Sequence, residues 1–193
     1  MGDGGVTAAM KRCLRVPHCA LALFAILAGG PDAHAQGSLE YAVKGAFLYK
    51  FLPFVEWPPS VFPAPNSPIA ICILGNDPFG PALDKVVSEQ RIAGHPLALH
   101  HLPVGADAAS CQAVFIGISD PRIEADAVHA LDGKPVLTIT DSGAADGGVI
   151  SFVVEQNHVR FDIDDAAAAH DGLVISSKLL DLARKVTPRK AAP

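Results

Sequence analysis

The sequence predicts an α/β domain with a mainly parallel sheet, flanked by helices on both faces, and with a C-terminal antiparallel hairpin and a final helix. The first observation is that two segments, 69–74 and 113–118, are apolar throughout instead of alternating. Continuously apolar strands are typical of sheets that are covered on both faces. The second observation is that the apolar segments 149–155 and 158–163 are separated by only two residues, which favours an antiparallel hairpin.

Length and composition are those of one globular domain. The chain has 193 residues, of which 50% are hydrophobic and 18% charged, so it can bury a sizeable core. At about 150 residues per domain, this length predicts a single domain. Acidic residues outnumber basic ones by 20 to 15, so the chain lacks the basic excess of a nucleic-acid-binding protein.

The first 35 residues have the pattern of a cleavable signal peptide. A basic segment at 11–15 precedes the apolar run 20–28, which is too short to span a bilayer. Residues 33–35, Ala-His-Ala, fit the small-x-small pattern that precedes a cleavage site. We therefore expect an exported mature chain that begins at Gln36, is not inserted in the membrane and forms a single domain over 36–193.

Proline and glycine divide the first half of the mature chain into short elements. We expect a helix over about 39–55, with Ser38 as its cap and Pro53 as the residue that kinks or shortens it. A proline-rich loop follows at 60–68. Beyond this loop the pattern predicts a strand at 69–74, a helix near 79–90 and a strand near 97–101.

The second half begins with another unit of a strand, a helix and a strand, expected at 113–118, 121–131 and 135–140. After the hairpin, Asp164 or Asp165 can cap a short alanine-rich helix that stops at Gly172. Apolar residues then recur at spacings of four, three and four, which is typical of an amphipathic final helix: Ile175, Leu179, Leu182 and Val186.

The sequence contains no convincing pattern of catalytic or metal-binding residues, so we expect no enzyme activity, cofactor or metal. Ser119 lacks the second flanking glycine of a nucleophile elbow and is better explained as part of a helix start before Pro121. Six histidines follow the signal peptide, and none stands four residues from another. Adjacent His100 and His101 would point to opposite faces of a strand. These histidines are best explained as ordinary surface residues in contact with solvent.

Cys72 and Cys111 are the two cysteines of the mature chain. In an exported protein two such thiols most simply form a disulfide, and the alternative is two separate buried thiols. Under the chain-entropy model, closing this loop would contribute on the order of 4 kcal/mol to stability.

The expected helix at 39–55 is apolar around most of its circumference. One stripe consists of Val43, Phe47, Phe51 and Phe54, and a second consists of Tyr41, Leu48 and Leu52. One stripe should cover the sheet, so the other needs a further partner, either the final helix or another protein.

Several sequence blocks, taken in order, resemble a known family. They run from Tyr41 through Phe54-Val-Glu-Trp-Pro58, then Ile71-Cys-Ile-Leu-Gly75, Asp77-Pro-Phe-Gly80, Val159-Arg-Phe-Asp-Ile163 and Gly172-Leu-Val-Ile-Ser-Ser-Lys-Leu-Leu180. In this order and spacing they are similar to the YfiR-like family of periplasmic regulators. The resemblance covers about 41–186, which is the expected core of the domain.

The resemblance implies a non-enzymatic periplasmic protein that binds the periplasmic portion of an inner-membrane diguanylate cyclase and represses it. Cyclic di-GMP signalling and biofilm formation would follow from this contact. The resemblance also implies a homodimer, an outer-membrane lipoprotein that can sequester the repressor, and a disulfide where Cys72 and Cys111 lie. Better-known members carry another cysteine pair in the carboxyl-terminal third, which this sequence lacks.

Leu173 and Leu180 are the first candidates for binding this partner. Both lie off the stripe of the expected final helix, so they are expected to remain exposed together and to supply an apolar anchor. The resemblance implies contact through the same carboxyl-terminal segment. If these leucines are not the contact, the second stripe of the first helix, Tyr41, Leu48 and Leu52, is the next candidate.

A periplasmic small-ligand receptor is the alternative function. Two loops are expected at the carboxyl ends of parallel strands, where α/β proteins commonly bind ligands. One loop presents Asn76 and Asp77, and the other presents Ser119 and Asp120. The same residues also suit plain helix caps.

Overall fold

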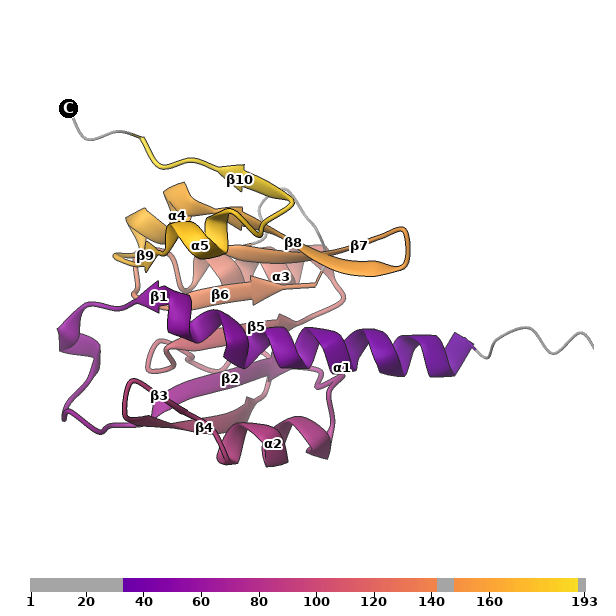
Figure 1. Ribbon diagram of the computed structural model, residues 1–193, viewed down its shortest axis with the longest axis horizontal. Coiled ribbons are helices and arrows are strands. Elements are labelled where there is room, and N and C mark those ends of the chain that lie inside the picture. The colour runs from indigo at the N-terminus through magenta and orange to yellow at the C-terminus, as the bar shows by residue number, and fades with distance from the viewer. Residues whose placement is uncertain (1–32, 142–147, 191–193) are drawn as a thin grey trace, which may run out of the picture.

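Eight strands form the main sheet, in the order β10-β8-β7-β6-β5-β2-β4-β3 (Figure 1). The computed structural model describes residues 33–141 and 148–190. Four parallel strands form the centre of the sheet: β4 (His95–Leu102), β2 (Ile69–Gly75), β5 (Ala113–Gly117) and β6 (Leu137–Thr140). The short strand β3 (Arg91–Ile92) pairs antiparallel with β4 at one edge. The prediction of a mainly parallel sheet is confirmed.

The other half of the sheet contains the predicted hairpin. Strand β7 (Ile150–Glu155) pairs parallel with β6 and antiparallel with β8 (His158–Asp164). Gln156 and Asn157 form the turn and both have positive φ, 48° and 63°, as the commonest tight two-residue turn requires. The hairpin is therefore confirmed at the positions that the sequence predicts.

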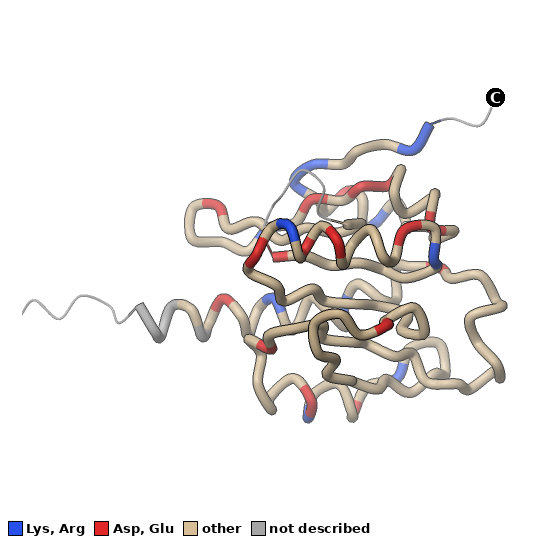
Figure 2. Tube along the Cα trace, turned by 180° about the vertical axis from the view of Figure 1, so that it is seen from behind, with Lys and Arg blue, Asp and Glu red and all other residues tan. Residues whose placement is uncertain are grey.

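Helices cover both faces of the sheet. Helices α1 (Ala33–Phe51) and α2 (Pro81–Ser88) pack against one face, and α3 (Pro121–His129) packs against the other. Figure 1 shows α1 in front of the sheet and α3 behind it, and Figure 2 shows the molecule from behind, with α3 towards the viewer. Alternate residues of β2 enter the two apolar clusters, Ile71 and Ile73 on the α1 side and Cys72 and Leu74 on the α3 side.

Pro53 shortens the first helix, as predicted. The α-helix stops at Phe51, and the proline lies in a 3-10 turn, η1 (Leu52–Phe54), because its ring cannot continue an α-helical hydrogen-bond pattern. At its other end α1 already begins at Ala33. The expectation that Ser38 caps this helix is therefore wrong, because Ser38 lies inside it.

The two apolar stripes of α1 and η1 pack largely against the core of this chain, although Val43 of the first stripe is 38% exposed. Phe47 and Phe51 pack against the two phenylalanines of the hairpin, with ring centroids between 4.9 and 6.1 Å apart. Leu48 and Leu52 belong to the same cluster and are 0% and 1% exposed. The expectation that Leu48 and Leu52 bind a partner is wrong for this structure, because the protein's own core surrounds them. Tyr41 is half-buried.

Aspartates cap two of the helices that follow strands, α3 and α4. The Asp120 side chain accepts hydrogen bonds from the backbone N–H groups of Arg122 and Ile123 at the start of α3. Asp164 accepts one from Ala167 N–H and so caps α4 (Asp165–His170). Both caps satisfy backbone donors that an uncapped helix leaves free.

The chain after α4 differs from the predicted final helix. Strand β9 (Val174–Ile175) comes first and pairs with β1 (Val55–Glu56) in a separate two-stranded sheet. Helix α5 (Ser177–Leu180) is a single turn, capped by the Ser176 hydroxyl, which accepts from Lys178 N–H. The predicted stripe is therefore divided between a strand and one helical turn.

The backbone N–H and C=O groups after residue 183 pair with strand β8 and do not continue a helix. Arg184 N–H donates to Phe161 O, and β10 (Lys185–Thr187) then pairs parallel with β8. Pairing at the sheet edge satisfies these groups, so no helix is required here. The expectation that the final helix extends to Val186 is wrong, because Val186 lies in β10.

Candidate partner-binding surface and ligand pocket

Two of the sequence blocks singled out above meet at β1 and β9. Val55 pairs with Ile175 and Glu56 with Val174 in antiparallel register. Ser176 N–H donates to Phe54 O, which extends the contact. The chain thus joins its Phe-Val-Glu-Trp-Pro block to its Leu-Val-Ile-Ser-Ser block, and both contribute to one region of the fold (Figure 1).

The side chains around β9 alternate between core and solvent. Leu173 is 1% and Ile175 4% exposed, whereas Val174 between them is 47% exposed. Successive residues of a strand point to opposite faces, so the extended backbone turns Leu173 inward and Val174 outward. The expectation that Leu173 remains exposed is therefore wrong, because it assumed helical spacing in a segment that forms a strand.

The burial of the residues around α5 differs in part from the prediction for an amphipathic final helix. Leu179 is buried as expected, and Leu180 is half-buried against the main apolar cluster. Leu182 was expected in the buried stripe and is instead 65% exposed, because the helix has already ended at Leu180. We call Val174, Leu180 and Leu182 the C-terminal apolar segment.

A buried ion pair joins α1 to the carboxyl end of β6. The Lys44 side chain is 3% exposed, and its ammonium group pairs with the carboxylates of Glu40 and Asp141. Tyr41 donates its hydroxyl proton to Asp141 Oδ2 over 2.9 Å. Burial, followed by the hydrogen bond to Asp141 and the negative charges of Asp141 and Glu40, raises the pKa of Tyr41 to about 12.

A pocket lies beside this ion pair, at the carboxyl ends of β2 and β5. Its volume is about 250 Å³, and its polar lining comes from Tyr41, Asn76, Ser119, Glu124 and Asp141. The chain passes from β2 to β4 on one side and later to β5 on the other. Such a reversal of strand order is where open α/β sheets commonly bind ligands.

The structure places two of the four predicted ligand-binding residues in the pocket lining. Asn76 and Ser119 line it, whereas Asp77 and Asp120 accept backbone hydrogen bonds in their own loops, Asp77 from Phe79 and Gly80. The lining also includes Tyr41, Glu124 and Asp141, which the sequence does not single out as ligand-binding residues. Asp141 carries a signal, because it directly follows an expected strand, as Asn76 and Ser119 nearly do.

A glycine allows the two pocket loops to approach each other. Asn76 N–H donates to Gly117 O over 2.9 Å, and a Cβ at Gly117 would lie only 2.1 Å from Asn76 O. No side chain fits at that distance. Gly117 therefore holds the loop after β5 against the loop after β2.

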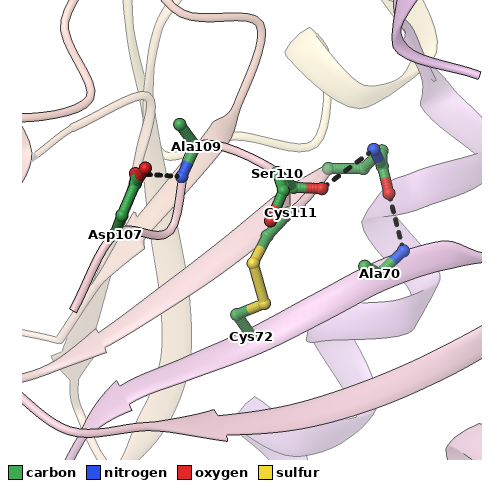
Figure 3. Close-up of a disulfide and its surroundings, with 7 residues drawn as sticks. Ala70, Cys72, Asp107, Ala109, Ser110 and Cys111 are labelled. Atoms are coloured by element: carbon green, nitrogen blue, oxygen red, sulfur yellow. Dashed lines mark hydrogen bonds between the residues drawn. A yellow bond between two sulfur atoms is a disulfide. The ribbon is translucent and has the colours of Figure 1, made fainter.

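The predicted disulfide joins Cys72 and Cys111 (Figure 3). Cys72 lies on β2, and Cys111 stands just before β5, so the bond connects neighbouring strands on the α3 side. Gln112 reinforces the same connection: its N–H donates to Ala70 O, and its Oε1 accepts from Ala70 N–H. Both cysteines are buried.

The described part of the chain contains no helix that is both long and apolar enough to cross a membrane. Most of the predicted signal peptide, residues 1–32, lies outside the described residues. A comparison with protein-family models matches residues 41–184 to the family described as YfiR/HmsC-like. This match spans most of the chain and includes both blocks that meet at β1 and β9. The protein therefore belongs to the YfiR/HmsC-like family.

Proposed function

We propose that the protein is a non-enzymatic periplasmic regulator, which binds the periplasmic portion of an inner-membrane diguanylate cyclase and represses it. Membership of the YfiR/HmsC-like family over residues 41–184 carries this proposal. The disulfide supports export, because such bonds persist in oxidising compartments such as the periplasm. A homodimeric state and an outer-membrane lipoprotein that sequesters the repressor are further parts of the proposal.

The cyclase contact is placed on the C-terminal apolar segment. Val174 and Leu182 are large aliphatic residues that are 47% and 65% exposed, and the half-buried Leu180 lies between them in sequence. Apolar anchors of this kind contribute most when a partner removes them from water. The segment also stands directly beside Glu56 of β1, so both family blocks border the proposed contact.

Rigid support for this surface comes from the core beneath it. Leu173, Ile175 and Leu179 are at most 4% exposed and hold the segment from inside. Ser176 anchors the segment at two points: its N–H donates to Phe54 O, and its hydroxyl oxygen accepts from Lys178 N–H. A surface on a fixed backbone loses less conformational entropy when it binds.

Cellular cyclic di-GMP tests the proposal. Cells that express the cyclase should contain little cyclic di-GMP when the wild-type protein is present and more when it is deleted. Val174→Glu and Leu182→Glu should behave like the deletion while the protein remains folded. Val154→Glu is the matched control, because Val154 is also a valine on a strand and is also 47% exposed. Equal repression by all the variants would refute the proposed surface.

A small-ligand receptor is the second candidate function, and the pocket between β2 and β5 is the observation that favours it. A thermal-shift screen of small metabolites should then identify a compound that stabilises the wild-type protein. Ser119→Trp, which places a large ring at the pocket lining, should abolish that shift. A shift that persists in Ser119→Trp would exclude this pocket as the binding site.

A further inference from the structure

Three metal-ligating side chains converge where the loop after α3 meets the end of α4. Asp132 follows α3, His170 is the last residue of α4, and Asp171 is its C-cap. One donor atom from each lies within 4.8 Å of the others. His170 Nε2 and Asp132 Oδ1 are 3.3 Å apart, and both side chains are 63% exposed, so they can adjust around an ion.

Asp171 provides the buried and oriented carboxylate of this group. It is 8% exposed, and Gly133 N–H donates to its Oδ1 over 2.8 Å. No other hydrogen bond from the described residues reaches this carboxylate. Its remaining lone pairs can therefore accept a further ligand such as a metal ion.

We propose that Asp132, His170 and Asp171 form a binding site for a divalent transition-metal ion, for which Zn²⁺ is the best match. One imidazole nitrogen with two carboxylates is a donor set that zinc accepts, whereas Mg²⁺ and Ca²⁺ prefer oxygen ligands alone. Ligands at about 2.1 Å in tetrahedral geometry lie about 3.4 Å apart, close to the His170–Asp132 separation. Water completes the coordination.

The surrounding backbone supports the same assignment. The hydrogen bond from Gly133 N–H orients Asp171 in the way that outer groups orient metal ligands. The ion would connect the loop after α3 to α4, which leads through Gly172 to Leu173 and β9. Metal binding is measured directly and does not depend on the proposed repressor function.

A simple ion pair between Asp132 and protonated His170 is the alternative explanation, and zinc titration distinguishes the two. The tag-free exported protein, freed of metal with a chelator, is titrated with ZnCl₂ by calorimetry and with Co²⁺ by visible absorption. We expect one zinc ion per chain and the visible bands of protein-bound Co²⁺. Asp132→Asn and His170→Ala change exposed side chains, so they should leave the fold intact and weaken zinc binding at least tenfold.

His158→Ala is the matched control, because His158 is exposed on the hairpin. It should bind zinc like the wild type. The site is refuted if the wild-type protein binds no zinc, if Asp132→Asn and His170→Ala both bind it normally, or if His158→Ala weakens binding equally. Circular dichroism of each variant establishes that a loss of binding is not a loss of folding.

Discussion

Val55 and Ile175 pair across the small sheet of β1 and β9, although they lie near opposite ends of the described chain. Their pairing brings two separated sequence blocks into one region of the fold. Val55 is 6% and Ile175 4% exposed, so the contact is part of the core. The neighbouring pair, Glu56 and Val174, faces outward. A partner that binds here would therefore contact residues from both blocks.

Leu173 and Val174 should differ sharply in their effect on stability. Leu173→Ala removes a buried side chain and should lower the free energy of unfolding by about 2–4 kcal/mol. Val174→Ala changes an exposed side chain and should lower it by less than about 0.5 kcal/mol. Urea denaturation of the two variants measures the difference. Equal losses would contradict the orientation of β9.

Replacing Cys72 and Cys111 together by alanine should destabilise the protein. The bond closes a loop with a sequence separation of 39 residues, so its loss should lower the free energy of unfolding by about 2–4 kcal/mol. Denaturation of the variant and of the reduced wild-type protein should give similar losses. A variant as stable as the oxidised wild type would show that the bond contributes nothing.

Tyr41 should make stability depend on alkaline pH. Its pKa rises from 10.0 to about 12 in the folded protein, so the folded state retains this proton more strongly than the unfolded state. The contribution is present below pH 10 and is lost as the pH rises towards 12. Tyrosinate absorbance should show a late titration that Tyr41→Phe abolishes. A wild-type titration without this late component would contradict the Tyr41–Asp141 contact.

Lys44 and Asp141 should be energetically coupled. Asp141→Asn leaves the buried Lys44 ammonium with Glu40 as its remaining ion-pair partner among the described residues, and should cost about 1–3 kcal/mol of stability. Adding Lys44→Met removes that buried charge and should recover part of the loss. A double-mutant cycle measures this coupling. Additive losses would show that the two side chains do not stabilise each other.

The sequence predicts the parts of this fold that depend on local patterns. Continuous apolar runs identify the central strands, the short link at Gln156 and Asn157 identifies the hairpin, and Asp120 identifies the start of α3. The two pocket loops also follow from this reading, because Asn76 and Ser119 come soon after central strands.

The carboxyl-terminal region depends on distant pairing, which sequence spacing does not report. Ile175 pairs with Val55, and Val186 pairs with Ile163 of β8, so tertiary partners override a helical period that only four apolar residues define. The burial of Leu173 and the exposure of Leu182 follow from that change. Asp132 and His170 likewise come together only through folding, since no spacing along the chain connects them.

Direct binding to the cyclase tests the central claim most directly. The periplasmic portion of the membrane diguanylate cyclase is immobilised, and the wild-type protein and two variants, Val174→Glu and Val154→Glu, are compared by biolayer interferometry. We predict that the wild type and Val154→Glu bind with the same affinity, while folded Val174→Glu binds at least tenfold more weakly because a charge replaces an apolar anchor. Absence of wild-type binding, or equal binding by Val174→Glu, would contradict the account.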